Sequence, residues 1–230
     1  MVVNARPHRK FPGIYWVTLE NYTQKLATEN LVPGKTFYGE RLISIKDTEY
    51  RVWDPFRSKL AAAILKGITT VPIQPNYKVL YLGAASGTTA SHISDIVGEN
   101  GHVYCVEFSA RTIRELVSNL CTHRHNVTPL LEDARMPEKY VMFVEKTDAI
   151  YCDIAQPEQA KILVENARLL LKKGGGTMLA VKSQSIDITK KPVEVYKQEV
   201  NILKKRGFAI IDLVQLEPYE RAHAMIVSKI

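Results

Sequence analysis

The chain has 230 residues and 46% of them are hydrophobic, enough for one medium-sized domain with a sizeable core, alone or with a small appendage. Lysine and arginine number 31 against 24 aspartate and glutamate, and the resulting net charge of +7 favours a polyanionic partner, nucleic acid above all. Three scattered cysteines without C-x-x-C spacing argue against a disulfide framework and a metal site. The sequence predicts neither a signal peptide nor a membrane-spanning stretch, so we expect an intracellular protein without membrane association.

The first 53 residues differ in pattern from the rest. Strand-like runs at 14–19 and 42–45, with turn signals at 33–34 and 46–47, predict a small β-rich N-terminal domain over 1–53. Asp54 and Pro55 then predict the start of a helix, with the aspartate as N-cap and the proline in the first helical position. Gly67 is expected to end this helix.

From residue 78 onward, apolar strand-like runs alternate with helical segments. A long helix is expected over 157–171, closed by residues 172–175. The runs lie at 79–82, 103–106, 127–131, 148–152, 177–182, 208–214 and 223–228. The last two have no helix between them and should form an antiparallel hairpin. Residues 54–230 are therefore predicted to form an α/β domain. Its seven-stranded, mostly parallel, doubly wound sheet ends in an antiparallel hairpin, as in the Rossmann-like class I methyltransferases and unlike dehydrogenases.

A glycine-rich turn follows the first of these strands. Residues 83–89 read Gly-Ala-Ala-Ser-Gly-Thr-Thr, and Glu107 ends the second strand 20 positions after Gly87. Glycines let a ligand approach the backbone, and a carboxylate after the next strand can accept hydrogen bonds from ribose hydroxyls. This pattern predicts a site for a nucleoside cofactor.

Polar side chains also stand at the ends of the next three strands, namely Asp133, Asp153 and Lys182. Taken singly, each is more often structural: a loop cap, a helix N-cap or a solvated strand end. Because ligands of open α/β sheets bind outside the carboxyl ends of the strands, the set in register favours one crevice. Lys59 and His223 are weaker candidates, since the sequence alone favours a surface lysine and a hydrogen-bonded strand histidine at these positions.

Several longer segments resemble fibrillarin over nearly the whole chain. They are Trp53-Asp54-Pro55-Phe56-Arg57-Ser58-Lys59 with the residues to 64, 79–89, Val106-Glu107-Phe108-Ser109, Glu132-Asp133-Ala134-Arg135, Ala155-Gln156-Pro157 and Leu216-Glu217-Pro218-Tyr219-Glu220-Arg221. The chain has no Gly/Arg-rich N-terminal extension of the eukaryotic type, and so is similar to the compact archaeal form.

The resemblance implies an S-adenosylmethionine-dependent 2′-O-methyltransferase that modifies rRNA, and in archaea tRNA, as the catalytic subunit of box C/D guide ribonucleoproteins. It implies a guide RNA, a Nop-domain scaffold protein and a kink-turn-binding ribosomal-type protein as partners. The expected location is the archaeal cytoplasm, whereas eukaryotic relatives are nucleolar. The N-terminal β-rich domain would serve in docking.

The resemblance also assigns residues. Lys59, Asp153, Lys182 and His223 would correspond to the catalytic tetrad, although glutamate is commoner at the fourth position. Tyr81 stands where an acidic residue is common, and Ala85 replaces the usual central glycine. The cofactor would be held by Gly83, Ala85, Thr88, Thr89, Glu107, Phe108, Asp133, Ala134, Asp153 and Gln156.

Lys182 is the candidate base for the ribose 2′-hydroxyl, with Lys59 as the neighbouring cation and Asp153 as the group that orients it. Two alternatives remain open at this point: another class I methyltransferase acting on a base, protein or small molecule, and a non-catalytic subunit that has kept only the fold. Candidate phosphate contacts are Arg57, Lys66, Arg111, Arg114 and Lys190-Lys191.

Overall fold

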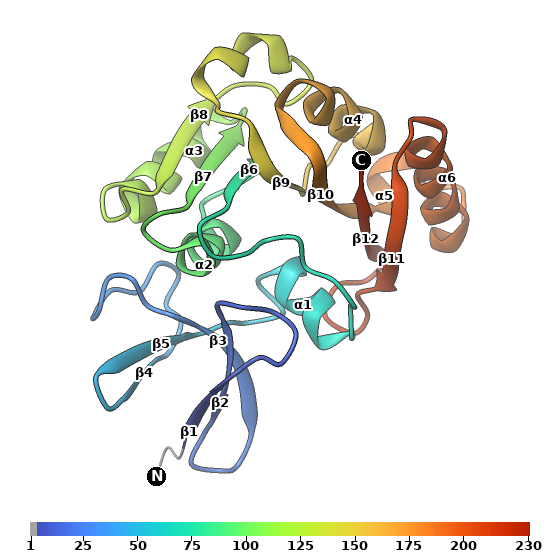
Figure 1. Ribbon diagram of the computed structural model, residues 1–230. Coiled ribbons are helices and arrows are strands. Elements are labelled where there is room, and N and C mark those ends of the chain that lie inside the picture. Colours follow the sequence, from blue (N-terminus) through green and yellow to red (C-terminus); the bar gives the residue numbers. More distant parts are fainter. Residues whose placement is uncertain (1–3) are drawn as a thin grey trace.

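The computed structural model describes residues 4–230, which form a small sheet beneath a larger, helix-covered one (Figure 1). The small sheet is antiparallel, with the strand order β1-β2-β3-β5-β4. Its strands are β1 (Asn4–Pro7), β2 (Ile14–Thr18), β3 (Gln24–Glu29), β4 (Leu42–Ile45) and β5 (Thr48–Val52). The sequence pattern predicted β2 and β4 and missed the other three. The missed strands are rich in charged and polar residues, so their extended conformation depends on pairing with neighbours.

The large sheet has seven strands in the order β11-β12-β10-β9-β6-β7-β8. Strands β6 to β10 are parallel, and β12 is antiparallel to both β10 and β11. The bounds are β6 (Lys78–Leu82), β7 (His102–Glu107), β8 (Val127–Leu131), β9 (Thr147–Cys152), β10 (Leu171–Lys182), β11 (Ala209–Gln215) and β12 (His223–Lys229). The predicted fold class, including the terminal hairpin, is confirmed.

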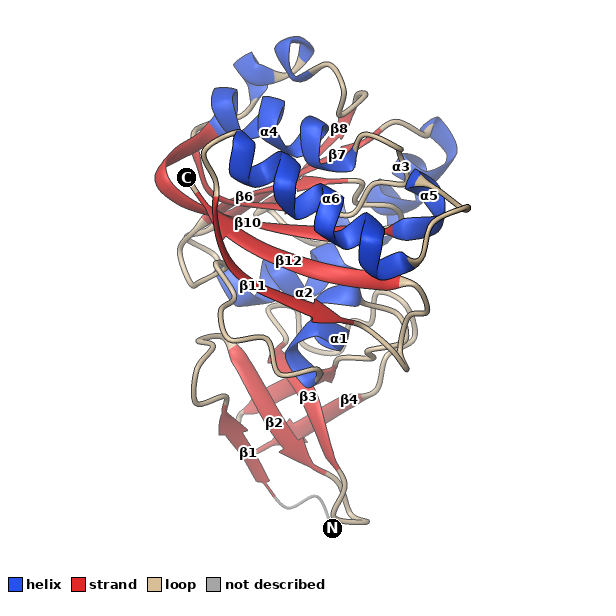
Figure 2. Ribbon diagram, turned by 90° about the vertical axis from the view of Figure 1, so that its right-hand side faces the viewer, coloured by secondary structure: helices blue, strands red, loops and turns tan. Residues whose placement is uncertain are grey.

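Helices cover both faces of this sheet (Figure 2). The chain order runs outward from β6 to β8 on one side and from β9 to β10 on the other. Right-handed crossovers in opposite directions place their helices on opposite faces. One face carries α1 (Lys59–Leu65), α2 (Thr88–Val97) and α3 (Ala110–Leu116), and the other α4 (Gln159–Leu170), α5 (Ser183–Ile186) and α6 (Pro192–Lys205). Short π and 3₁₀ turns follow α3 and β8, at Val117–Cys121, Pro137–Lys139 and Val141–Phe143.

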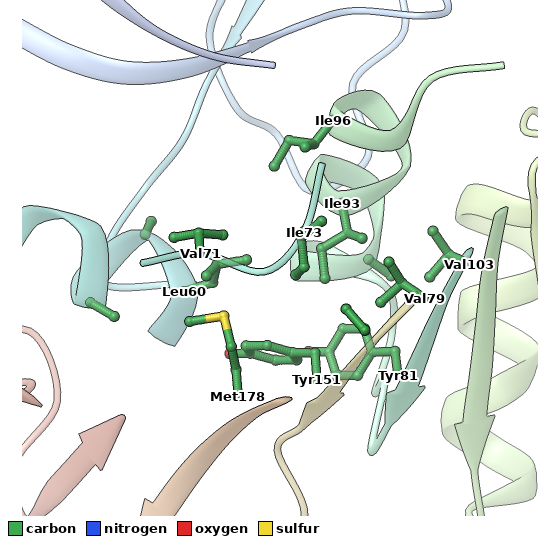
Figure 3. Packing of buried hydrophobic residues seen from close by; sticks show 14 of the residues in the cluster. Leu60, Val71, Ile73, Val79, Tyr81, Ile93, Ile96, Val103, Tyr151 and Met178 are labelled. Atoms are coloured by element: carbon green, nitrogen blue, oxygen red, sulfur yellow. The ribbon is translucent and has the colours of Figure 1, made fainter. Parts of the chain in front are cut away.

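The strand β6 shows why this sheet is buried on both sides. Val79 and Tyr81 pack in the core beneath α1 and α2, whereas Leu80 and Leu82 pack in the core beneath α4 and α6. Successive side chains of a strand point to opposite faces, so a continuous apolar run fills two cores at once. Figure 3 shows the first core, where Tyr81 and Tyr151 lie edge to face under Leu60 and Ile93.

Two predicted boundaries were wrong. The helix α1 begins at Lys59, not at Pro55, because Ser58 is extended and its hydroxyl accepts a hydrogen bond from the Ala61 N–H. Asp54 instead accepts from the Phe56 N–H at 2.9 Å and holds a tight loop. Residues 172–175, expected to close the long helix, lie inside β10, since Leu171 already pairs with Thr147.

A buried charged network joins the small sheet to the large domain. Arg51 of β5 lies 2.6 Å from Glu40 and 2.7 Å from Asp95 of α2, and Arg124 lies 2.6 Å from the other oxygen of Asp95. Beside them His92 contacts the hydroxyls of Thr28 and Tyr38 through its two ring nitrogens. The predicted division at residue 53 thus falls next to an interface of buried hydrogen-bonded charges. Over residues 4–230, no helix is long and apolar enough to cross a membrane.

Candidate active site

A cavity of about 300 Å³ opens at the carboxyl ends of the central parallel strands, where the strand order reverses between β9 and β6. This is where open α/β sheets bind ligands. It is lined by Gly83, Ala85, Val106, Glu107, Phe108, Glu132, Asp133, Ala134, Arg135, Asp153, Ile154, Ala155, Gln156, Ile162 and Lys182. Eight of the ten residues predicted to hold the cofactor are in this set.

Gly83 allows the chain to turn sharply out of β6. Its φ is +79°, and a β-carbon at this position would lie 2.8 Å from the backbone oxygen of Asp153. No other residue type fits both the left-handed conformation and this close approach. The turn therefore brings the glycine loop directly against the end of β9.

Ala85 adopts a left-handed conformation too, with φ of +50°, which costs an L-residue about 1–2 kcal/mol. Its N–H donates to Glu107 Oε2 at 3.1 Å, while the Ser109 N–H donates to Oε1 at 3.0 Å. Glu107 thus holds the turn in place of a central glycine. Each carboxylate oxygen keeps a further lone pair for the hydroxyls of a ligand.

Asp133 is held by its own loop. The guanidinium of Arg135 donates to both of its oxygens, at 2.5 to 3.1 Å, and these hydrogen bonds lower the pKa of the Asp133 carboxyl. The carboxylate is ionised at neutral pH, and its remaining lone pairs can accept from an exocyclic amine. Phe108, 70% exposed, presents a ring to the same cavity.

The cavity is acidic. Four carboxylates line it, from Glu107, Glu132, Asp133 and Asp153, against the two cations of Arg135 and Lys182. A small-molecule ligand with net positive charge suits this lining better than a polyphosphate. The protein's overall positive charge is therefore not a property of this cavity.

Beside the cavity, Asp153 binds two lysines. Its Oδ2 lies 3.2 Å from Nζ of Lys59, and its Oδ1 lies 2.9 Å from Nζ of Lys182, which also donates to the Asp153 carbonyl oxygen at 3.0 Å. The three side chains are 12–18% exposed. Although β9, β10 and α1 lie far apart in the sequence, they place two ammonium groups on one carboxylate.

His223 is the first residue of β12 and stands opposite Lys182 in the antiparallel register. Residues directly opposite each other share a face of the sheet. The His223 Nδ1 lies 2.6 Å from the carbonyl oxygen of Arg221, so Nδ1 carries the proton and Nε2 is left as the acceptor in the neutral ring.

Glu220 was not among the predicted site residues. Its two oxygens lie 3.8 Å from Lys59 Nζ and 3.9 Å from His223 Nδ1, so it bridges two of the four predicted catalytic side chains. The available signal was its place in the segment 216–221, three residues before His223. Because a carboxylate at this spacing on a loop is common, the pattern alone did not select it.

Thr88 and Thr89 do not line the cavity. Thr89 is buried, and its hydroxyl donates to Oγ of Ser58 at 2.9 Å, which joins α2 to the N-cap of α1. This contact joins α2 to the segment that carries Lys59, and the predicted cofactor contacts of Thr88 and Thr89 stay a prediction. Lys59 and His223 also lie outside the cavity lining, and each is next to a lining residue, Lys59 in contact with Asp153 and His223 opposite Lys182.

Thiol and metal chemistry find no support within residues 4–230. Burial raises the pKa of Cys152, which directly precedes Asp153, to about 12, and burial also raises the pKa of Cys105. A thiol that keeps its proton is a poor nucleophile. In the same range no group of three histidine, cysteine, aspartate or glutamate side chains could hold a metal ion.

The sheet order, the terminal hairpin and the acidic cavity at the reversal point define a class I methyltransferase fold. Solved methyltransferase structures of low identity share it: a S-adenosylmethionine-dependent O-methyltransferase from Thermotoga maritima superposes with a TM-score of 0.55 at 13% identity, covering 95% of this chain and 93% of that one. The match to the fibrillarin family model, over residues 5–230, is more specific. The chain belongs to the fibrillarin family, and the resemblance seen in its motifs is confirmed.

Individual relatives and solved structures support the same family. A Pyrobaculum islandicum protein named fibrillarin-like rRNA/tRNA 2′-O-methyltransferase is 56% identical, over 99% of this chain and 97% of its own. Aeropyrum pernix fibrillarin, solved with natively bound S-adenosyl-L-methionine, has a TM-score of 0.93 and 49% identity, covering 99% of both chains. The fibrillarin chain of a fibrillarin/Nop5p complex has a TM-score of 0.83 and 40% identity, covering 97% of this chain and 99% of that one.

Proposed function

We propose that this protein is an S-adenosylmethionine-dependent enzyme that methylates ribose 2′-hydroxyls of rRNA and tRNA. The observation that carries the proposal is the pairing of Lys59 and Lys182 on Asp153, where Asp153 and Lys182 line an acidic cavity. The names of the Pyrobaculum relatives support the same substrates and reaction.

The cavity suits S-adenosylmethionine, which carries one sulfonium and one ammonium charge against one carboxylate. When bound, it supplies a methyl group on a positively charged sulfur. Glu107 would accept from its ribose, Asp133 from its adenine amine, and Phe108 would cover the base, while Gly83, Ala134 and Gln156 complete the lining. The glycine turn and the ionised Asp133 are already in place for this ligand.

Lys182 is the proposed base. A ribose 2′-hydroxyl loses its proton reluctantly, so a positioned acceptor is worth about 10²–10⁴-fold in rate. The free amine of Lys182 would take this proton at Nζ, and the resulting ammonium would be stabilised by Asp153, to whose Oδ1 and carbonyl oxygen it is already bonded. Lys59 binds the other oxygen of Asp153 and holds this carboxylate beside Lys182.

Alignment supplies the larger share of the acceleration. Holding the attacking oxygen in line with the group it attacks contributes up to about 7–11 kcal/mol. His223, facing Lys182 across the β10–β12 pair, would accept a hydrogen bond from the ribose through Nε2. The Lys59–Asp153 contact fixes the carboxylate from the side of α1.

We also propose the assembly in which the enzyme acts. It would be the catalytic subunit of an archaeal box C/D guide ribonucleoprotein, in the cytoplasm, with guide RNA, a Nop-domain scaffold and a kink-turn-binding protein. The fibrillarin/Nop5p complex supports a Nop-domain partner. The β-rich N-terminal domain, divided from the rest at residue 53, would be a docking unit.

The test is reconstitution with guide RNA and scaffold protein, followed by single-turnover methylation and mapping of alkali-resistant phosphodiester bonds. Wild-type protein should protect one bond per guide, and Asp153→Ala and Lys182→Ala should slow methylation by about 10²–10⁴-fold. Methyl transfer to a base, which leaves every bond sensitive to alkali, would disprove ribose specificity. Lys182→Ala at near wild-type rate would remove Lys182 as the base.

A further inference from the structure

Two aromatic rings stand at the rim of the lysine–aspartate cluster. Phe56 is 63% exposed and lies in the loop three residues before Lys59. Tyr219, from the loop between β11 and β12, meets it edge to face with ring centroids 5.2 Å apart. Neither ring belongs to the cavity described above. Aromatic rings beside cations offer faces on which the bases of a nucleic-acid strand can stack.

Both rings are held in place by hydrogen bonds on either side of them. The Phe56 N–H donates to Asp54 Oδ1 at 2.9 Å, and the Tyr219 N–H donates to the Leu216 oxygen at 2.9 Å. The residue after Tyr219 is Glu220, whose carboxylate lies 3.8 Å from Lys59 Nζ. Because the two rings are inclined at 70°, a flat group stacks on the exposed Phe56 ring, and Tyr219 supports that ring from the side. The stacked group would lie at a fixed position relative to Lys59 and Asp153.

A basic groove adjoins the same loop. It has a volume of about 370 Å³, lies between the small sheet and residues 52–57, and carries the exposed cations Lys25, Arg41 and Arg57. Within residues 4–230 none of the three has a carboxylate within 4.0 Å, and the carboxylate of Glu40 in the groove wall is bound to buried Arg51. Asp54 also lines the groove, and its Oδ1 accepts from the Phe56 N–H. Three exposed cations therefore face one carboxylate that is not bound to Arg51, and the groove has a net positive charge, in contrast to the acidic cavity.

We propose that Phe56 and Tyr219 form a stacking platform for a base of the acceptor RNA strand, next to the ribose at the lysine–aspartate cluster, and that the basic groove binds phosphates of that strand. This inference rests on the proposed function. Aromatic rings beside cations bind nucleic-acid strands without reading sequence, since every base has a π-face. Such a surface suits an enzyme whose target is selected by guide pairing.

The platform is tested with an RNA that carries 2-aminopurine beside the target ribose, bound by the reconstituted particle without cofactor. Stacking on Phe56 quenches the fluorescence, and Phe56→Leu, which keeps an apolar side chain of similar bulk, should restore it. The same variant should raise the RNA concentration for half-maximal methylation about tenfold, whereas Phe56→Tyr should match wild type. Affinity for S-adenosylmethionine, measured by calorimetry, should stay within twofold in both variants.

The groove has its own measurement. Arg57→Gln and Arg41→Gln should each lower the slope of log affinity for RNA against log salt by about 1, with little change in the fluorescence quench. Unchanged slopes would overturn the phosphate assignment.

The outcomes separate the two proposals. Quenching by a wild-type particle that transfers no methyl to ribose would leave the platform standing and overturn the proposed function. Ribose methylation with equal fluorescence and equal RNA dependence in wild type and Phe56→Leu would overturn the platform and leave the function standing.

Discussion

Two clusters in this molecule both combine two cations with an aspartate, but they differ in burial and in the type of cation. At the junction, Arg51, Asp95 and Arg124 are at most 1% exposed, and their closest contacts are 2.6 and 2.7 Å. At the strand ends, Lys59, Asp153 and Lys182 are 12–18% exposed, and the lysine–aspartate distances are 2.9 and 3.2 Å. The first cluster is dry and the second is open to solvent on one side.

The difference in burial and in residue type separates a structural ion cluster from the cluster that we propose to be reactive. Arginine keeps its proton at any ordinary pH and fixes geometry through a planar fork, so the junction cluster can hold two sheets together but cannot take part in proton transfer. A lysine amine can gain and lose a proton, and partial exposure leaves room for a substrate beside it. Buried arginine beside aspartate thus suits a structural role, whereas partly exposed lysine beside aspartate suits proton transfer.

The largest expected effect comes from removing the central cation of the junction. Arg51→Met leaves Glu40 buried without its partner and should lower the free energy of unfolding by about 3–5 kcal/mol, measured by denaturant titration. The matched change at the open cluster, Lys59→Met, should cost about 1 kcal/mol or less while lowering methylation. Equal loss of stability in both variants would remove the distinction between the clusters.

Gly83→Ala should disturb the open cluster alone. The added methyl group would press on the Asp153 carbonyl, 2.8 Å away, to which Lys182 is bonded. A shift of the reacting side chains by about 1 Å costs about 10²-fold in rate. Single-turnover methylation measures it, and Gly34→Ala, at a left-handed turn with open space around it, is the control for backbone strain.

Acidic pH should lower the free energy of unfolding through His92, which lies beside the buried arginine–aspartate cluster between the two sheets. Burial, followed by the charges of Arg51 and Arg124, holds the pKa of His92 well below 6.5 in the folded protein. Below pH 6.5 the unfolded chain binds a proton at this position and the folded chain does not. Stability present above pH 6.5 is therefore lost as pH falls, with a limiting slope of about 1.4 kcal/mol per pH unit. In His92→Gln the slope between pH 5 and 6.5 should be shallower by this amount; parallel profiles would contradict the assignment.

The smallest effect is expected at Glu220. Its contacts to Lys59 and His223 are long, at 3.8 and 3.9 Å, and its side chain is 31% exposed. Glu220→Gln should change the methylation rate only a few-fold and leave the melting temperature unchanged, in keeping with the weak coupling of exposed charge pairs. A loss as large as that of Asp153→Ala would make Glu220 a full member of the cluster.

The sequence predicted the large sheet well because its strands are buried on both faces and read as apolar runs, as in β6 and β9. The polar residues after those runs predicted the cavity, since strand ends share an edge. The strands β1, β3 and β5 were missed because their pattern is set by pairing, not by burial of continuous apolar runs.

The predicted start of α1 was wrong because the sequence contains two possible N-caps for this helix. Asp54-Pro55 and Ser58 are both acceptable helix starts, and only the packing of Leu60 to Ile64 against the sheet selects Ser58. Arg51, Asp95 and Arg124 look like ordinary surface charges in a sequence, because nothing local reports that three distant segments bury them together. Glu220 and Phe56 were not selected from the sequence for the same reason, because their contacts are with residues distant in the chain.

The position of β12 has a further consequence. This strand is inserted between β10 and β11, and it brings His223 to face Lys182. During synthesis, residues 59, 153 and 182 all leave the ribosome before β12 does, and β10 has no antiparallel neighbour until β12 arrives. The four side chains therefore come together only as the last strand enters the sheet. A chain released by a ribosome that stalls before residue 223 lacks both the buried side chains of β12 and the histidine that faces Lys182.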